Sequence, residues 1–358
     1  MKRYIRSLVG QDKINKFLAA LRYARLRIDL SLIRLCSLTR FSAGLYYLFF
    51  NHGFKREQQS VLCARLAYHK EDAASLQTSA LLRRNTHRLE KGLIMRPRKS
   101  IFAESYIRET VECYAQSIKI PGFSIEELKW AGDVLREYFQ VVDDPSVDEP
   151  RTLFMRLDVV SKEPSILYSP YERERVAQSG INYDNLLVLF KQRRSVRWYE
   201  DKPVEINLIK QAVTAASYAP SACNRQSFYF YLVIEKDKIK AVADCAMGTV
   251  GFADNIPCLI VVVGDLSAYP EDRDRHIIYI DSALASMQLM LSFEALGLSS
   301  CPINWPDIES REARLQRLLA LPDSCRPTMM ISVGYALGKG GIPYSQKKNA
   351  DTLIKVVE

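Results

Sequence analysis

The stretch PCLIVVVGD occupies residues 257–265 and is apolar without interruption until Gly264 and Asp265. A half-exposed strand would alternate apolar and polar residues, so an unbroken apolar run favours a strand that is buried on both faces. We therefore expect this stretch to lie inside a sheet that helices cover on both sides.

The neighbouring residues alternate between strand and helix patterns, which favours the same architecture. The helix predicted over residues 276–296 is apolar almost all round, so we expect it to be buried or to form a subunit interface. Other helices are predicted over residues 183–192, 205–218 and 238–245, and strands over residues 228–234, 298–303 and 328–335.

The chain before residue 180 has a different pattern. It favours helices, one over residues 71–93 that ends at Gly92 and one that begins at the capping box Ser124-Ile-Glu-Glu. An acidic, proline-marked break at residues 143–150 leads into a segment that we expect to be irregular. The predicted parts of the chain are residues 1–57, 58–180 and 181–358.

The first 57 residues carry the whole net charge of the chain. They contain 12 Lys and Arg residues against Asp12, Asp29 and Glu57, whereas acidic and basic residues balance in the remainder. This asymmetry indicates contact with an anionic surface, and no nucleic-acid-binding motif accompanies it. The apolar run Phe41–Phe50 is shorter than the roughly 20 residues that a spanning helix needs. Two readings stay open: a basic amphipathic helix lying on an anionic membrane, or a helix packed on the protein.

Cysteine and histidine usage indicates the compartment. The eight cysteines are scattered without a CxxC pair, and the four histidines form no cluster with them. This pattern is typical of reduced thiols in a cytoplasmic protein, and it predicts no metal centre. No signal peptide is expected at the N-terminus.

Four short motifs in the C-terminal half carry groups suited to a polar, anionic ligand. We name them the arginine motif, RRSVRWY (Arg193–Tyr199), the polar turn, APSACNRQ (Ala219–Gln226), the cysteine strand, GLSSCPINW (Gly297–Trp305), and the lysine motif, SQKK (Ser345–Lys348). Three guanidiniums within five residues repel one another unless they meet an anion, and arginine is suited to bidentate contact with phosphate. The alternative readings are a solvated basic cluster, ordinary turns and a solvated tail.

Taken together and in this order, the motifs resemble those of the nitroreductase family of FMN oxidoreductases, over about residues 183–358. The resemblance implies an α+β, nitroreductase-like FMN-binding fold, a mixed sheet flanked by helices, preceded here by a mostly helical N-terminal region. It also implies FMN as the cofactor, NAD(P)H as the electron donor, a small-molecule substrate, and a homodimer formed through His276–Leu296. In this type of site the flavin carries the hydride chemistry and the protein supplies orientation and electrostatics.

The resemblance assigns cofactor contacts residue by residue. The arginine motif implies contacts to the phosphate, ribityl chain or ring oxygens, the polar turn lies along the flavin, the cysteine strand lies beside the ring, and the lysine motif binds phosphate. The residues that match are Arg193, Arg194, Ser195 and Arg197, then Pro220, Ser221, Asn224 and Gln226, then Pro302, Ile303 and Asn304, and finally Lys347 and Lys348.

One departure from the family concerns the cover of the flavin. The segment Leu266–Arg275 is short where many relatives carry insertions over the substrate, so we expect the N-terminal region to supply the cover. The stretch HRLEKGL at residues 87–93 resembles extensions of nitroreductase-like bacterial proteins associated with surface polysaccharide genes. His87 and Glu90 are therefore predicted as catalytic groups, the alternative being ordinary ion pairs between helices.

The function expected from this reading is a two-electron transfer between NAD(P)H and a bound acceptor, in a cytoplasmic flavoprotein with a peripheral membrane contact and a role in polysaccharide biosynthesis. Two alternatives stay open. One is a flavin oxidase or dehydrogenase that acts on a biosynthetic intermediate. The other is a membrane-peripheral binding factor that has kept the fold without turnover.

Overall fold

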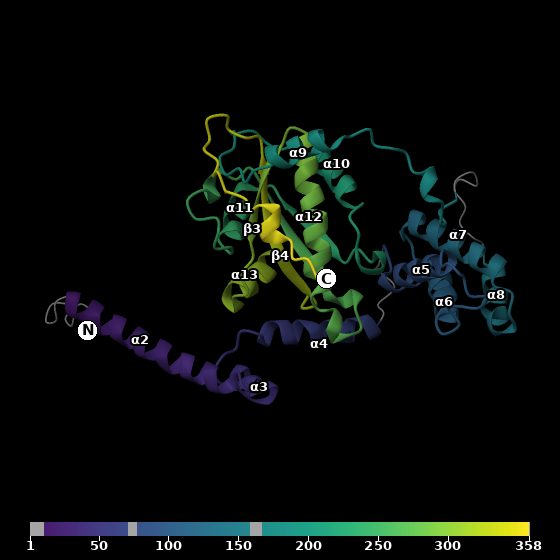
Figure 1. The fold of residues 1–358 in the computed structure, drawn as a ribbon, viewed down its shortest axis with the longest axis horizontal. Helices are drawn as coiled ribbons and strands as arrows, with labels where there is room; N and C mark the ends of the chain where they lie inside the picture. Colours follow the sequence, from purple (N-terminus) through teal and green to yellow (C-terminus); the bar gives the residue numbers. More distant parts are fainter. Residues whose placement is uncertain (1–10, 71–76, 158–166, 358) are drawn as a thin grey trace. The chain divides into compact units, whose positions relative to one another are not determined.

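The computed structural model describes residues 11–70, 77–157 and 167–357, which form two compact units (Figure 1). One unit comprises the described residues up to Gln59 together with Asp307–Glu309, and the other comprises the remaining described residues. The first six residues of the helix predicted over residues 71–93 lie outside the described ranges.

The N-terminal unit consists of helices α2 (Gln11–Cys36) and α3 (Arg40–Phe49) and the beginning of α4 (Lys55–Lys70). Thr39 caps α3 by accepting the Ser42 N–H, and the Tyr46 hydroxyl donates to Asp29 Oδ1 at 2.6 Å, which joins α3 to α2. Among the described residues, no helix combines the length and the apolar character that crossing a membrane requires.

A helical region, residues 77–157, has its own apolar core. It contains α5 (Ala80–Leu93), α6 (Ile107–Ser117), α7 (Ile125–Val141) and α8 (Asp148–Met155), with a 3-10 turn at Pro145–Val147. The predicted break at residues 143–150 is thus wrong in part, because α8 begins inside it. Pro150 lies in the first turn of α8, where a backbone N–H has no partner within the helix.

The helix predicted over residues 71–93 ends at Leu93 as predicted but begins only at Ala80, and the capping box predicted at Ser124 is partly right. Ser124 caps α7 by accepting the Glu127 N–H, but the Ser124 N–H donates to the Gln77 carbonyl instead of to Glu127, so the capping box is half formed. Gly92 is the penultimate residue of α5, and a side chain there would overlap the Phe102 ring. Close packing therefore explains glycine at this position.

The sheet domain, residues 181–357, is built on a four-stranded sheet with the order β1-β2-β4-β3. All three pairings are antiparallel, so the sheet is antiparallel and not mixed as predicted. An isolated parallel bridge joins Ser195 to Ser300 beside the β3 edge. The strands are β1 (Phe228–Val233), β2 (Cys258–Asp265), β3 (Ser299–Asn304) and β4 (Cys325–Gly334).

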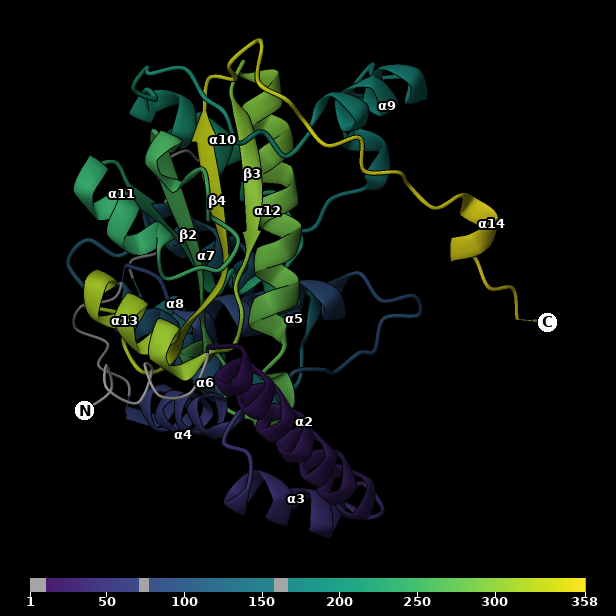
Figure 2. The ribbon, with the colours of Figure 1, turned by 90° about the vertical axis from the view of Figure 1, so that its left-hand side faces the viewer.

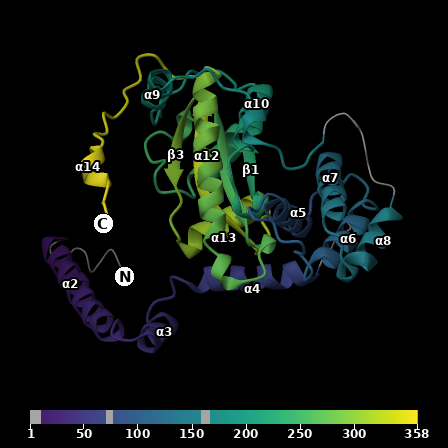
Figure 3. The ribbon, with the colours of Figure 1, turned by 45° about the vertical axis from the view of Figure 1, so that its right-hand side comes forward.

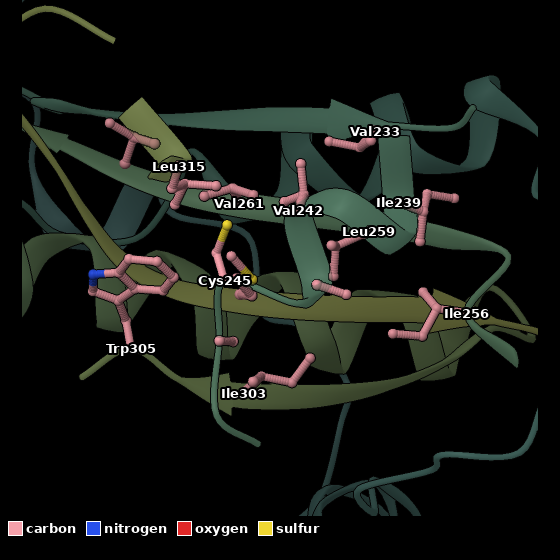
Figure 4. Packing of buried hydrophobic residues seen from close by; sticks show 14 of the residues in the cluster. Val233, Ile239, Val242, Cys245, Ile256, Leu259, Val261, Ile303, Trp305 and Leu315 are labelled. Carbon is pink, nitrogen blue, oxygen red and sulfur yellow. The ribbon is translucent and has the colours of Figure 1, made fainter. Parts of the chain in front are cut away.

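Helices cover both faces of this sheet (Figure 2). On β2, Leu259, Val261 and Val263 pack into the core shared with α11 (Lys236–Ala243) and α13 (Glu309–Leu319), part of which is shown in Figure 4. The alternate residues Cys258, Ile260 and Val262 pack toward α10 (Ile206–Ala216) and α12 (Ile277–Ala295). Both faces of β2 are therefore buried, as the apolar run predicted.

Helix α12 runs along one face of the sheet, between β1 and β3 in the view of Figure 3. Its inward side buries Ile278, Leu289 and Phe293, whereas Ile280 and Leu284 remain 58% and 44% exposed. The remaining elements are α9 (Tyr183–Gln192), α14 (Ala350–Leu353), and 3-10 turns at Arg173–Arg175, Ala222–Asn224, Ala253–Asn255, Leu266–Ala268 and Asp272–Asp274.

Candidate functional site

The arginine motif follows α9 and lies along the edge strand β3. The Val196 N–H donates to the Ser300 carbonyl at 3.1 Å, and Ser195 forms the parallel bridge with Ser300. At the end of α9 the Gln192 side-chain amide donates to Glu294 of α12 at 3.4 Å. The structure thus brings the arginine motif to the beginning of the cysteine strand.

The guanidiniums of this motif lie close together in sequence and form no close ion pair with a carboxylate among the described residues. Arg193, Arg194 and Arg197 form no ion pair within the part of the chain that the structure describes, and the buried Nε of Arg193 has no hydrogen-bond partner there. Burial raises the pKa of the Cys301 thiol, and the positive charges of Arg197 and Arg193 oppose that rise. These arginines therefore face the cysteine strand and create a local excess of positive charge.

The lysine motif is connected to the same corner. Arg194 Nη2 donates to the Pro343 carbonyl at 2.8 Å and also to the Tyr344 carbonyl, which holds the segment just before the lysine motif. Lys347 and Lys348 are exposed. Their amines are consequently free to move toward an anion near the arginine motif.

The three predicted residues of the cysteine strand differ in accessibility. The Ile303 side chain is buried in the apolar core with Leu259 and Val261, so only its backbone could contact a ligand. Pro302 is half-buried and Asn304 is exposed. The strand therefore offers backbone groups and one amide side chain.

The polar turn has a strained backbone. It contacts α12 near Asp281, away from the end of the helix that lies beside the arginine motif. The Ala222 N–H donates to Asp281 Oδ2 at 2.9 Å, and Cys223, Asn224 and Gln226 all have φ of 52°. The Gln226 side-chain amide donates to the Ser217 carbonyl at 2.6 Å, and the Gln226 backbone N–H donates to Ser221 Oγ at 3.2 Å. Predicted contacts Ser221 and Gln226 are thus already used inside the turn, while Pro220 is exposed.

Within one chain, three of the four motifs come together and the fourth does not. The arginine motif contacts α12 through Glu294, and the polar turn contacts it through Asp281. These two positions are 13 residues apart, which corresponds to roughly 20 Å along a helix. The polar turn is therefore far from the arginine motif of its own chain.

His87 and Glu90 lie on α5 and contact each other, Nδ1 to Oε2, at 3.3 Å. The Trp130 indole N–H of α7 donates to Glu90 Oε1 at 3.0 Å. The two side chains retain 33% and 23% exposure, so a ligand could reach them. The ion-pair reading and the catalytic reading are both compatible with this geometry.

Arg83, one helical turn before His87, was missed by the sequence reasoning. Its guanidinium contacts the polar turn, and α5 packs on the 3-10 turn Ala222–Asn224. Arg83 and His87 are four residues apart and therefore lie on one face of α5. This spacing could have identified Arg83 from the sequence. A cavity of about 580 Å³ adjoins this contact, lined among others by Arg83, Glu127, Arg225, Gln226, Tyr229 and Asp265. The helical region thus forms a wall beside the polar turn.

The segment Leu266–Arg275 is covered in part in the structure. Leu266, Ala268 and Tyr269 are buried against Ala64 of α4 and Ile278 of α12. The first part of this segment, residues 266–269, therefore packs in the protein core, whereas Glu271, Asp272, Arg273 and Arg275 are exposed.

Comparison with known proteins agrees with this architecture. The model of the nitroreductase family matches residues 190–251 and 242–335. A protein of Archaeoglobus fulgidus, "Putative NADH dehydrogenase/NAD(P)H nitroreductase", is 30% identical over 155 residues, which cover 42% of this chain and 86% of that protein. The "FMN reductase [NAD(P)H]" of Bacillus subtilis is 26% identical over 157 residues, covering 40% of this chain and 62% of that protein.

Among solved structures, an FMN-dependent nitroreductase from Clostridium difficile R20291 is 25% identical, with a TM-score of 0.39 and coverage of 44% of this chain and 92% of that one. The two sequence relatives carry the names of oxidoreductases, the class of enzyme that the sequence predicted. The helical region lies before the matched residues. The chain belongs to the nitroreductase family.

Proposed function

We propose that the protein is an FMN-dependent oxidoreductase that transfers two electrons between NAD(P)H and a bound acceptor. The observation that carries this proposal is the cluster of Arg193, Arg194 and Arg197, which has no ion-paired carboxylate among the described residues. Such a cluster fits the phosphate of FMN, since guanidiniums bind phosphate in charge-assisted pairs. When bound, the flavin would supply the hydride chemistry.

The residues of the chain would bind and orient the cofactor. Arg193 and Arg197 would hold the phosphate end with Lys347 and Lys348, and the orphaned Nε of Arg193 would gain an acceptor. The flavin ring would lie beside Pro302, Ile303 and Asn304, and the backbone groups of β3 would contact it. Burial of Ile303 fixes that backbone in place.

A homodimer would complete this site. The exposed apolar side chains Ile280 and Leu284 of α12 favour a subunit interface. If two α12 helices pack antiparallel about a two-fold axis, Asp281 of one protomer lies near Glu294 of the other. The polar turn of one subunit would then meet the arginine motif of its partner, which one chain alone cannot achieve.

The helical region is proposed to cover the flavin on the side of the polar turn. His87 would donate a proton to the reduced acceptor, since imidazole is the side chain most often used for proton transfer, and Glu90 would orient the ring. His87→Ala is expected to lower turnover at unchanged FMN occupancy, whereas exposed His69→Ala, on α4, serves as the control. Equal turnover in both variants would remove His87 from the mechanism.

The absorbance spectrum of the purified protein, recorded before and after anaerobic addition of NADPH, tests the main proposal. A yellow protein that NADPH or NADH bleaches supports the reductase. A yellow protein that neither nicotinamide bleaches would contradict the proposed direction and favour the oxidase. A protein that stays colourless after incubation with FMN would contradict flavin binding altogether and favour the binding factor.

The N-terminal part is proposed as a peripheral contact to an anionic membrane in the cytoplasm, serving a surface polysaccharide pathway. Several large apolar side chains of α2 are exposed beside its arginines, including Phe17, Leu21 and Ile28 at 64%, 50% and 63%. In this proposal, residues 1–57 contact the membrane, residues 58–180 cover the flavin and residues 181–358 bind it. Sedimentation with phosphatidylglycerol vesicles should be strong at low salt and weak at high salt. Equal binding to neutral vesicles would contradict the role of charge.

A further inference from the structure

Arg83 donates to three separate acceptors, two in the polar turn and one in the helical region, and so joins the two. Its Nε donates to the Asn224 carbonyl at 2.8 Å, and its Nη2 donates to Gln226 Oε1 at 3.1 Å. Its Nη1 donates to Glu127 Oε2 at 3.0 Å. One guanidinium therefore fixes a backbone group and a side chain of the turn at once, using the fork geometry that lysine lacks.

The polar turn needs such support because its backbone is unfavourable by itself. Cys223, Asn224 and Gln226 have left-handed φ values, and none of them is glycine. Non-glycine residues hold this conformation only where surrounding contacts determine it. Besides the bonds of Gln226 to Ser221 and Ser217, the contacts here include the Asp281 carboxylate on the Ala222 N–H and the Arg83 guanidinium on the Asn224 carbonyl.

Arg83 is itself held rigidly by the helical region. Glu127, whose side chain is 2% exposed, also accepts the Ser79 N–H at 2.9 Å and the Thr78 hydroxyl. The Trp130 ring lies 5.4 Å from the guanidinium carbon. Because a buried carboxylate and an aromatic ring fix the guanidinium, its two donors to the turn are oriented in advance.

We propose that Arg83 is a positioning residue for the flavin site, which holds the polar turn in its binding conformation and makes cofactor affinity depend on the helical region. This inference rests on the proposed function, because it takes the polar turn as part of the FMN site. Arg83 acts through the turn and is not assigned a contact with the flavin.

The experiment compares Arg83→Met with Arg84→Met in the full-length protein. Methionine keeps an unbranched apolar stem and removes the donors. Arg84 is the matched control, because it is the next residue of α5 and is 17% exposed against 16% for Arg83. It bonds Tyr68 of α4 and Asn85 and Glu109 of the helical region instead of the turn. Since R83M leaves Glu127 unpaired, R83M/E127Q is measured beside it.

Two quantities are measured: the dissociation constant of FMN by fluorescence titration, and amide hydrogen exchange of residues 222–227 without FMN. We expect R83M and R83M/E127Q to weaken FMN binding by about tenfold or more, the equivalent of one charge-assisted hydrogen bond. Exchange in the turn should accelerate in both variants. R84M should stay within about twofold of wild type in affinity, as for changes away from a site.

Arg83→Lys separates positioning from general folding. Lysine keeps the charge but cannot span three acceptors, so FMN affinity should lie between those of R83M and wild type. If R83M and R84M have equal FMN affinity and equal exchange in the turn, the inference is overturned. Failure of the wild-type protein to bind FMN would instead refute the proposed function, so the two failures are distinguishable.

Discussion

The two ends of α12 hold their motifs in different ways. Near its beginning, the Asp281 carboxylate accepts the Ala222 N–H, and Arg83 bonds the other side of the polar turn. Near its end, Glu294 accepts a long bond of 3.4 Å from the Gln192 amide, and the arginines of the arginine motif remain without ion-paired carboxylates among the described residues.

This difference separates a scaffold from a binding surface. At the polar turn, Arg83 is paired with Glu127 and Asp281 accepts a backbone N–H, which stabilises one conformation of the backbone. Arg225 of the turn lies over the Tyr269 ring, and its buried Nε has no hydrogen-bond partner among the described residues. The cations of the arginine motif repel one another, and only an anion from outside relieves the repulsion. The contrast between the paired Arg83 and three clustered arginines without ion pairs marks the arginine motif as the candidate binding surface.

The largest effect is expected where the charges are unpaired. Replacing Arg193 and Arg197 by Ala should weaken FMN binding at least about a hundredfold, because each charge-assisted hydrogen bond contributes roughly 1.5–3 kcal/mol. FMN retention after gel filtration measures the loss. The matched control is the double replacement of Arg314 and Arg317, two exposed arginines on α13 across the sheet, which removes the same charge. Equal retention in the two proteins would refute the phosphate site.

A second, smaller effect concerns the contact that should bring the two ends of α12 together. Ile280→Glu should raise the dissociation constant of the dimer at least about tenfold, since burying an isoleucine side chain is worth roughly 1.5–3 kcal/mol. FMN affinity should fall with it. Val250→Glu, at a site that is 88% exposed, is the control. If light scattering finds that the wild-type protein is a monomer with bound flavin, the proposal that two chains form the flavin site is wrong.

The smallest effect is a pH dependence of stability at the scaffold end. Burial raises the pKa of Asp281 above 3.8, although the Ala222 N–H and the Tyr269 hydroxyl oppose the rise. As the pH rises past 3.8, the unfolded carboxyl ionises before the folded one, so the wild type loses stability relative to Asp281→Asn until the folded pKa is passed. The difference in melting temperature between D281N and wild type should therefore grow with pH.

Glu294 supplies the comparison at the other end of the helix. Burial also raises the pKa of its carboxyl, with Gln192 and Arg193 opposing. The difference in melting temperature between Glu294→Gln and wild type should therefore also grow with pH, beginning near pH 4.5. Bound phosphate should not change the pH dependence of the difference for D281N. A D281N difference that stays constant or shrinks as the pH rises would contradict the assigned burial.

The local pattern was enough to place most elements of the sheet domain. The apolar run at residues 257–263 became β2, and the predicted helix at residues 183–192 matches α9 residue for residue. Buried strands and capped helices are specified by residues close in sequence. The missed helix α8 shows the limit, because proline was read as a break where it lies in a first turn.

The sequence by itself determined the family, the four motifs and the chemistry that their side chains allow. Only the tertiary structure decided which of them meet. Arg83 bonds Asn224 across 141 residues, and the polar turn lies along α12 away from the arginine motif. Contacts of such separation depend on the path of the whole chain and on its closure entropy, and no local pattern encodes them.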